Sequence, residues 1–421
     1  MSLTDRDLKV IWHPYTQMKT AAPPIPIVRG EGAFLFDEYG KQYIDAVSSW
    51  WVNIHGHAHP YIARKVSEQL HKLEHVIFAG FTHEGAIELA ERLLKILPDN
   101  QQKVFYSDNG STAVEVAIKM CLQYWHNKGE KRTKIIAFKN AYHGDTFGAM
   151  AVSGRSAFTA AFDQLLFEVE FIDLPDEQNI LHLKAQISHL KSEAACFIFE
   201  PLVQGAGGML MYEAGYLNEL MARCRGEGVL MIADEVFTGF GRTGKPFACD
   251  HVTEAPDIMC FSKGLTGGTM ALGLTTCTQQ VFDAFLSDDK LKTLFHGHSF
   301  TANPVACAAA LASLDLFLAP STHENIEKIS RMHSQFGEKI KDHPSVKTIR
   351  QTGTIFAMEW ETGSNTSYFN SLRDKLYNYF LEAGIILRPL GNTLYILPPY
   401  CITTDQLNYI YAKIEQALSE I

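Results

Sequence analysis

The feature that most restricts the fold of this chain is an alternation of short apolar runs with amphipathic stretches, from about residue 60 to residue 318. The strand-like runs include KVFYS, KIIAF, ACFIFEP, VLMIADE and DIMCFS, and helical patterns such as STAVEVAIKMCLQYW and LNELMARCRGEG lie between them. Strands that are apolar on both faces are typical of a mostly parallel sheet covered by helices. The alternation therefore predicts an α/β fold.

The segments on either side of this alternation have different patterns. Before residue 49, the stretch GAFLFDEYGKQYID predicts a hairpin with its turn at 38–40. After about residue 319, a helix over 324–341, several strands and two further helices predict a smaller α+β unit. We therefore expect three parts, which are an N-terminal segment that packs with the small domain (1–48), a large domain that binds the ligand (49–319) and a C-terminal small domain (320–421).

The composition argues against several classes of protein. Lys and Arg number 37 against 47 Asp and Glu, and no basic cluster is present, so a nucleic-acid partner is not expected. The 8 cysteines are scattered singly, which indicates reduced thiols in the cytoplasm. The N-terminus has no apolar secretory core, and no run reaches the roughly 18 apolar residues of a membrane span. No metal is expected, because no acid or cysteine accompanies the histidines of HGHAHP at 55–60.

Polar residues follow several of the predicted strands, where ligands of open α/β sheets bind. Gly110 and Ser111 open a helix whose free N–H groups suit a phosphate, although an ordinary helix cap is the alternative. Asp234 ends an apolar run, where a carboxylate needs a cation or a hydrogen-bond donor. Glu200 ends another run and can either bond near a ligand or cap the strand, so we leave it out of the predicted site. Lys263 follows DIMCFS, where burial can keep an amine partly neutral and nucleophilic.

A phosphate-binding helix end, a carboxylate and a lysine at strand ends together match the needs of pyridoxal 5'-phosphate. The lysine can form a Schiff base with the aldehyde of the cofactor, and the carboxylate can keep the ring nitrogen protonated so that the ring accepts electrons. The helix N-terminus can hold the phosphate. Our hypothesis is therefore that Lys263 and Asp234 face one flat ring.

The chain also resembles a known family. The pattern DEVFTGFGRTG at 234–244, followed by SKG at 262–264, is similar to the signature of the class III aminotransferases, which have PLP fold type I. The similarity covers nearly the whole chain, through DAVSSWWVNIHGHAHP, NAYHGDT, FEPLVQGAGGM and HGHSFTANPVACAAA. The resemblance implies a large domain with a mostly parallel seven-stranded sheet, an aminotransferase that uses pyridoxal 5'-phosphate, and a homodimer with shared active sites.

Within this family, the stretches IWHPYTQM, SSWW and LRPLGNTLYILPPY are similar to the members that act in biotin formation. That similarity implies transfer of an amino group from S-adenosylmethionine to 8-amino-7-oxononanoate, which gives 7,8-diaminononanoate. An acceptor with an aliphatic chain and a distant carboxylate suits an aromatic slot that ends in a guanidinium. The alternatives are another class III ω-aminotransferase, acting on ornithine, 4-aminobutyrate or β-alanine, an aminomutase, or a catalytically silent binding protein of the same fold.

The resemblance also implies roles in the cofactor site. Lys263 would carry the cofactor and move a proton between substrate and cofactor, and Asp234 would pair with the ring nitrogen. Tyr142 would stack on the ring, although it could instead close a buried hydrogen-bond network. At 298–299 the chain has histidine and serine where the family would have proline and threonine. The implied cofactor-binding set is Gly110, Ser111, Tyr142, Asp234, Lys263, His298 and Ser299, with Ser299 coming from the neighbouring subunit.

A second set of residues would bind the substrate. Tyr15 and Trp50 would wall the pocket, although core packing is the alternative for the tryptophan. Gly297 would contact the substrate through its backbone. Arg388 would receive the substrate carboxylate, and a surface ion pair is the alternative for its guanidinium. The implied substrate-binding set is Tyr15, Trp50, Tyr142, Lys263, Gly297 and Arg388.

Overall fold

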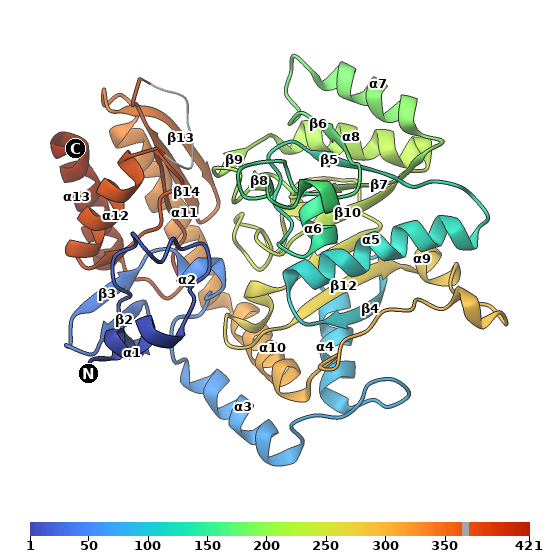
Figure 1. Cartoon of the computed structure of the whole chain (residues 1–421), viewed down its shortest axis with the longest axis horizontal. Coiled ribbons are helices and arrows are strands. Elements are labelled where there is room, and N and C mark those ends of the chain that lie inside the picture. Colours follow the sequence, from blue (N-terminus) through green and yellow to red (C-terminus); the bar gives the residue numbers. More distant parts are fainter. Residues whose placement is uncertain (364–369) are drawn as a thin grey trace.

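The centre of the structure, a computed structural model that describes residues 1–363 and 370–421, is a seven-stranded sheet (Figure 1). Strand β12 runs antiparallel to its neighbours β4 and β11, and the other neighbouring pairs are parallel. The predicted α/β class with a mostly parallel sheet is confirmed. In spatial order the strands are β4 (Gln101–Ser107), β12 (Gly273–Thr278), β11 (Ile258–Phe261), β10 (Leu230–Asp234), β7 (Ala194–Phe199), β5 (Lys134–Phe138) and β6 (Glu170–Ile172).

The central strands are apolar throughout because both of their faces are covered. In β7, Cys196 and Ile198 belong to the core on one side of the sheet, whereas Phe197 and Phe199 belong to the core on the other side. This alternation follows from the two-residue period of a strand. Burial of each of these isoleucine and phenylalanine side chains stabilises the fold by about 1.5–3 kcal/mol.

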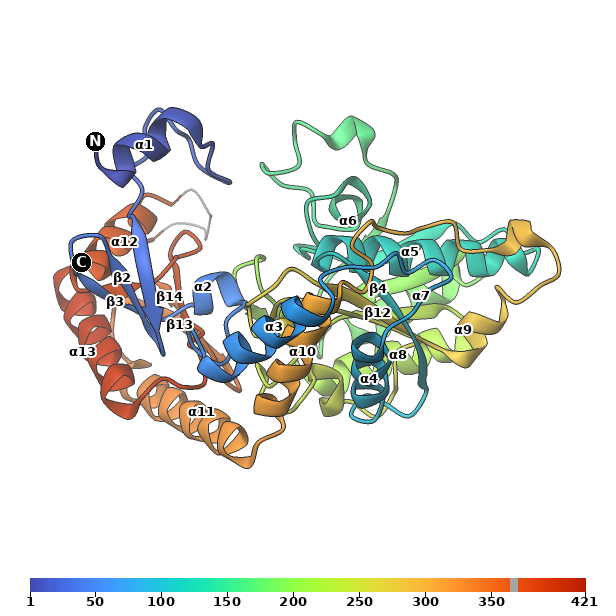
Figure 2. The same ribbon diagram turned by 90° about the horizontal axis from the view of Figure 1, so that it is seen from below.

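Helices cover both faces of the sheet. Figure 2 shows α5 on one side of the sheet and α4 and α8 on the other side. The core on the α5 side also takes in residues of α6 and α9, while α7 and α10 contribute to the core on the opposite side. The helices of this part are α3 (Pro60–Lys72), α4 (Glu84–Leu94), α5 (Gly110–Asn127), α6 (Phe147–Ala151), α7 (Ile180–Leu190), α8 (Ala214–Glu227), α9 (Gln279–Asp283) and α10 (Pro304–Phe317).

The N-terminal and C-terminal parts of the chain share a second sheet. It contains β1 (Ile27–Glu31), β2 (Phe34–Asp37) and β3 (Gln42–Asp45), each antiparallel to the next. The hairpin of β2 and β3 is the one predicted. Strand β3 also pairs in parallel with β15 (Ile385–Ile386). Both chain ends accordingly lie on the same side of the molecule in Figures 1 and 2. The division of the chain at residues 49 and 320 stays a prediction.

The rest of the C-terminal part is a three-stranded sheet with helices packed on it. Its first helix begins at Pro320, earlier than predicted, because proline fits the first turn of a helix. No single helix of the described residues has the length and apolarity to cross a membrane. Helices α10 and α11 (Pro320–Ile340) have that length and apolarity only when taken together, and the pair is bent by 69°. The remaining elements are α1 (Leu3–Val10), α2 (Ser48–Trp51), β8 (Val203–Gln204), β9 (Leu210–Met211), α11 (Pro320–Ile340), β13 (Val346–Thr352), β14 (Ile355–Trp360), α12 (Leu372–Glu382), β16 (Thr393–Ile396) and α13 (Thr404–Glu420).

Candidate active site

A cavity of about 480 Å³ opens at the carboxyl ends of the parallel strands. Its size is in the usual range for small-molecule sites, and its position is the one expected for a ligand of an open α/β sheet. The hypothesis that a lysine and an acid face one ligand requires that both side chains line the same space. Both side chains line this cavity, as do three other predicted residues. The five are Gly110, Ser111, Tyr142, Asp234 and Lys263.

The order of the strands brings these residues together. Asp234 is the last residue of β10, and Lys263 follows the neighbouring strand β11 after one serine. Glu200 follows β7, the neighbour of β10 on its other side. Because parallel strands end at the same edge of a sheet, three residues that are far apart in the sequence become neighbours.

Asp234 is held by a histidine that sequence reasoning did not select. The Oδ2 atom of Asp234 lies 2.7 Å from Nδ1 of His143, and its Oδ1 accepts a hydrogen bond of 3.1 Å from the backbone N–H of Val236. Both side chains are buried, and Nε2 of His143 has no hydrogen-bond partner within the described structure. The only signal in the sequence was the position of His143 beside Tyr142 in NAYHGD. Two contacts therefore fix the orientation of the carboxylate toward the cavity.

Lys263 sits in a strained backbone conformation with its amine among aromatic rings. Its φ of 43° lies in the left-handed region, which is disfavoured for a residue with a side chain and recurs at functional sites. Nζ lies 4.7 Å from the ring centroid of Trp51 and 5.8 Å from that of Phe237. Burial lowers the pKa of the Lys263 amine to about 8, although the charges of Asp234 and Glu200 act in the opposite direction. A useful fraction of the amine is therefore neutral near physiological pH.

Glu200, which we left out of the predicted site, lines the same cavity. Its carboxylate accepts hydrogen bonds from the backbone N–H groups of Tyr142 (2.9 Å) and Gly205 (3.0 Å). Burial raises the pKa of Glu200 to about 7. The contact with Tyr142 shows that Glu200 holds the loop that carries both this tyrosine and His143, so its role is more than that of a strand cap.

The N-terminus of α5 forms one wall of the cavity. The side chain of Asn109 caps the helix by accepting the N–H of Thr112 at 3.1 Å. The N–H groups of Gly110 and Ser111 belong to the first turn, whose donors have no acceptor within the helix. A Cβ atom on Gly110 would lie 2.7 Å from Cγ1 of Val236, so only glycine fits here without a shift of its neighbour. This wall therefore presents free backbone donors and the positive end of a helix dipole.

Two tyrosines meet at one carboxylate beside the cavity. The hydroxyl of Tyr15 donates to Oδ2 of Asp145 at 2.6 Å, and the hydroxyl of Tyr142 donates to the same atom at 3.0 Å. The ring of Tyr15 also meets the ring of Trp50 edge-on, with 5.7 Å between their centroids. Since the side chain of Trp50 is 40% exposed, core packing is the wrong reading for this tryptophan, whereas Trp51 is buried.

Arg388 lies over the same tryptophan. The Cζ atom of its guanidinium is 4.4 Å from the ring centroid of Trp50. Among the described residues it forms no ion pair and no hydrogen bond, so the alternative of a surface salt bridge is not what the structure contains. A half-buried guanidinium stacked on an indole, with its donors unused, is a ready receptor for a carboxylate.

The structure does not bring Gly297, His298 and Ser299 to the cavity of this chain. Gly297 and Ser299 are exposed. Nδ1 of His298 lies 3.3 Å from Oδ2 of Asp108, and its Nε2 lies 3.0 Å from Nε2 of His296. These three predicted residues therefore do not line the cavity of their own chain.

The histidines of HGHAHP do not converge on one point. His55 bonds to the hydroxyl of Ser313 at 3.0 Å, and His57 bonds to Oδ2 of Asp45 at 2.9 Å. Within the described ranges, 1–363 and 370–421, no group of three or more metal-ligating side chains is placed to hold a metal ion.

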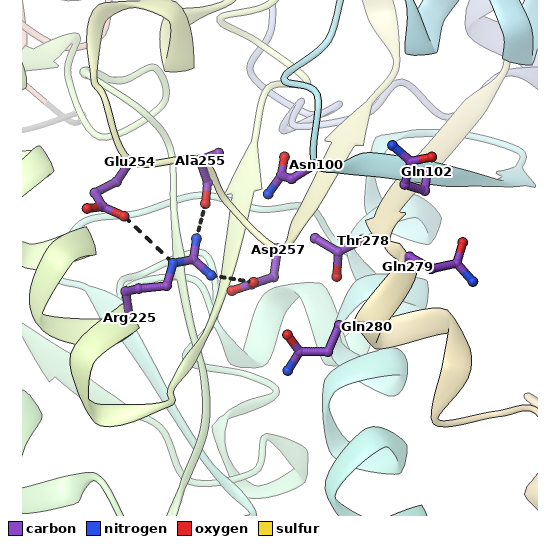
Figure 3. A pocket seen from close by; sticks show the side chains of 9 residues that line it. All are labelled: Asn100, Gln102, Arg225, Glu254, Ala255, Asp257, Thr278, Gln279 and Gln280. Atoms are coloured by element: carbon purple, nitrogen blue, oxygen red, sulfur yellow. Dashed lines mark hydrogen bonds and ion pairs between the residues drawn. The ribbon is translucent and has the colours of Figure 1, made fainter.

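A larger hollow of about 780 Å³ lies at the opposite, amino ends of the strands (Figure 3). Arg225, the one cation among the described residues that line it, pairs with Asp257 at 2.7 Å and with Glu254 at 3.7 Å. It also donates to the backbone of Ala255, as the dashed lines show. Because these groups satisfy one another, we assign this hollow no function.

Comparison with known proteins agrees with this geometry. The family described as aminotransferase class-III matches residues 15–418. The adenosylmethionine-8-amino-7-oxononanoate aminotransferase of Synechococcus elongatus is 48% identical over 421 residues, covering 98% of this chain and 99% of that protein. The crystal structure of the enzyme of the same name from Methanocaldococcus jannaschii has a TM-score of 0.95 at 38% identity, covering 99% of this chain and 98% of that one. An amine transaminase from an uncultivated Pseudomonas species, solved in its PLP-bound form, has a TM-score of 0.91 at 31% identity and 98% coverage of each chain.

Proposed function

The chain belongs to the class III aminotransferases, and from this premise we propose that it transfers an amino group from S-adenosylmethionine to 8-amino-7-oxononanoate, giving 7,8-diaminononanoate for biotin formation. The family makes it an enzyme that uses pyridoxal 5'-phosphate. The observation that carries the proposed acceptor is the guanidinium of Arg388 over Trp50, which has no ion pair among the described residues. The residue after this tryptophan, Trp51, lines the cavity that Lys263 and Asp234 share.

The donor set of the cavity fits this cofactor. The N–H groups of Gly110 and Ser111 suit its phosphate, and the carboxylate of Asp234 suits a protonated ring nitrogen. The amine of Lys263 is the group that would hold the aldehyde carbon. When bound, the cofactor supplies an electron sink that makes the proton on the substrate carbon acidic.

Each of these side chains also has a task in the proposed reaction. The Nζ atom of Lys263, whose pKa burial lowers to about 8, would take the proton from the substrate carbon and hold it for its return. Asp234, held by His143, would offer its carboxylate to the ring nitrogen. The rings of Trp51 and Phe237 beside the amine exclude water from the proton transfer.

The acceptor would lie along the aromatic wall. The rings of Tyr15 and Trp50 offer an apolar surface to its aliphatic chain, and the guanidinium of Arg388 offers paired donors to its distant carboxylate. Tyr142 and Gly297 complete the proposed substrate contacts, with Gly297 coming from the partner subunit.

Replacement of Arg388 by alanine is expected to raise KM for 8-amino-7-oxononanoate by about 10- to 100-fold, because a charge-assisted hydrogen-bond pair contributes about 1.5–3 kcal/mol. The rate of the half-reaction with the donor should stay near that of the wild type. Steady-state kinetics on the acceptor, beside single-turnover kinetics on the donor, measure both quantities. Equal losses in the two half-reactions would place Arg388 outside the acceptor site.

The pKa of Lys263 predicts how the cofactor-free protein takes up pyridoxal 5'-phosphate. Because burial lowers this pKa to about 8, the neutral amine becomes more abundant as the pH rises toward 8 and dominates above it. The rate of covalent uptake should therefore increase about tenfold per pH unit below pH 8 and level off above it. Stopped-flow absorbance between pH 6 and 10 measures this rate. A rate that keeps rising toward pH 10 would show that the amine has its ordinary pKa.

The substrate pair itself is tested by an assay with product identified by mass. Purified protein loaded with pyridoxal 5'-phosphate, S-adenosylmethionine and 8-amino-7-oxononanoate should yield 7,8-diaminononanoate. Glutamate, ornithine, 4-aminobutyrate and β-alanine are offered in parallel as donors. Bleaching of the cofactor absorbance by one of these, and not by S-adenosylmethionine, would favour another ω-aminotransferase, and a colourless protein that takes up no cofactor would favour a silent binding protein.

A homodimer with shared active sites is part of the proposal, as is a cytoplasmic location. Gly297, His298 and Ser299 do not line the cavity of their own chain, which supports their delivery to a second subunit, where the serine hydroxyl would meet the cofactor phosphate. The eight cysteines are free thiols, seven of them buried, which supports a reducing compartment.

Analytical ultracentrifugation is expected to give about twice the 47.1 kDa of one chain. Mixing Lys263→Ala subunits with Ser299→Ala subunits tests the sharing of sites. In a mixed dimer, one of the two sites combines Lys263 with Ser299 of the other subunit, and the other site lacks both groups. Activity recovered on mixing supports shared sites, whereas an active monomer contradicts them.

A further inference from the structure

The tryptophans beside the cavity lie on a turn of unusual handedness. All four residues of α2, Ser48–Trp51, have positive φ, with values of 50°, 45°, 70° and 73°. Left-handed backbone is disfavoured for every residue with a Cβ atom, and it rarely extends beyond single positions. Four in succession persist only where the surrounding structure holds them.

Two contacts of the proposed reaction depend on this turn. The ring of Trp50 carries the guanidinium of Arg388 at 4.4 Å. The ring of Trp51, the next residue, lies 4.7 Å from Nζ of Lys263. In a right-handed turn, the two side chains would leave in other directions, so the handedness decides whether they face the acceptor and the lysine.

One buried arginine binds the backbone at the end of the turn. The side chain of Arg242 is only 1% exposed. Its Nη1 donates to the carbonyl of Pro398 at 2.9 Å, and its Nη2 donates to the carbonyls of Trp51 and Asn53, both at 3.4 Å. Arg242 therefore joins the turn to the segment after β16, at the place where α2 lies between the two parts of the molecule (Figure 1).

Within the described structure, the charge of Arg242 is not neutralised by a carboxylate at ion-pair distance. Its nearest aromatic partner is Tyr400, whose ring centroid is 5.1 Å from Cζ. A buried cation without a carboxylate partner is costly, and here the hydrogen bonds to three backbone carbonyls offset part of the cost. Its charge also acts with burial to lower the pKa of Lys263.

We propose that Arg242 is a positioning residue for amino transfer, whose buried guanidinium holds the left-handed Ser48–Trp51 turn so that Trp50 faces the acceptor and Trp51 faces Lys263. The inference rests on the aminotransferase activity. It holds for any acceptor that uses the aromatic wall.

The test compares Arg242→Lys, which keeps the charge but cannot reach three carbonyls, with Arg242→Gln, which removes the charge. Both variants should lose about 10- to 100-fold in kcat/KM for the acceptor, because small displacements of reacting groups have effects of that size. In cofactor-free protein, Arg242→Gln should move the pH dependence of pyridoxal 5'-phosphate uptake to higher pH, whereas Arg242→Lys should leave it unchanged.

The matched control is Arg132→Lys. Arg132 also donates to two backbone carbonyls, those of Lys191 and Gly228, and stacks on the ring of Trp125, but it does not line the cavity. This control should lower the melting temperature and leave both the kinetics and the pH dependence of uptake unchanged. Wild-type kinetics and wild-type pH dependence in both folded Arg242 variants would overturn the proposal.

The remaining outcomes also decide. Failure of Arg242→Lys to fold would mean that Arg242 is needed for the stability of the fold and would likewise overturn the proposal. If the wild type forms no 7,8-diaminononanoate, the proposed substrate pair fails. The Arg242 variants are then compared on the acceptor that the enzyme does use, because the turn faces any acceptor that lies along the aromatic wall.

Discussion

Replacement of Lys263 by alanine is expected to lower the rate of transamination by about 10⁴-fold or more while the cofactor stays bound without a covalent bond. The loss is large because one amine acts both as the group that holds the cofactor and as the base that moves the proton. The cofactor should remain because Asp234 and the N-terminus of α5 still meet its two charged ends. Absorbance of the purified variant and single-turnover kinetics measure the two effects.

Lys245→Ala is the matched control for this variant. Lys245 lies between Asp234 and Lys263 in the sequence, but its amine is exposed and donates to the carbonyl of Asp250 at 2.8 Å. Its removal should leave the rate unchanged. Normal turnover by Lys263→Ala would remove the central residue of the proposed mechanism.

Replacement of Asp234 by asparagine is expected to lower kcat by about 10²- to 10³-fold, the usual effect of losing one preorganised electrostatic contact. Asparagine has nearly the same shape, so the change removes the negative charge that would keep the ring nitrogen protonated. It also leaves Nδ1 of His143, now 2.7 Å from the carboxylate, beside a neutral amide. The affinity for pyridoxal 5'-phosphate should fall as well, which fluorescence titration of the cofactor-free protein measures.

Asp257→Asn controls for the burial of Asp234. Asp257 is equally buried, but it lies at the amino end of β11 and pairs with Arg225 at 2.7 Å. Its replacement should lower the melting temperature and leave kcat per folded molecule unchanged. A similar loss of kcat in both variants would mean that Asp234 acts through stability.

Much of the site followed from residues at the ends of apolar strands. The prediction selected Asp234 because a carboxylate that ends a buried strand needs a cation or a hydrogen-bond donor. It selected Lys263 because an amine near the end of a buried strand can be kept partly neutral. It selected Gly110 and Ser111 because the first N–H groups of a helix are free. These are local arguments, and all four residues line one cavity.

The residues that sequence reasoning missed act through contacts between distant segments. His143 is 91 positions from Asp234, and Glu200 is 58 positions from Tyr142, yet each pair is joined by a hydrogen bond. Arg242 bonds to the backbone of Asn53, which lies 189 positions away. No pattern along the chain marks such pairs, because only the packing of the strands and turns makes them neighbours.

The sequence by itself determined the class of fold and the chemical groups, because the period of apolar residues defines strands and helices, and strand ends define where charged side chains lie. The tertiary structure decided which groups face one another. It separated exposed Trp50 from buried Trp51, which are adjacent in the chain, by a left-handed turn that no local preference favours. It also placed Ser299 outside the cavity of its own chain, because that position depends on how distant segments pack and not on the residues beside it.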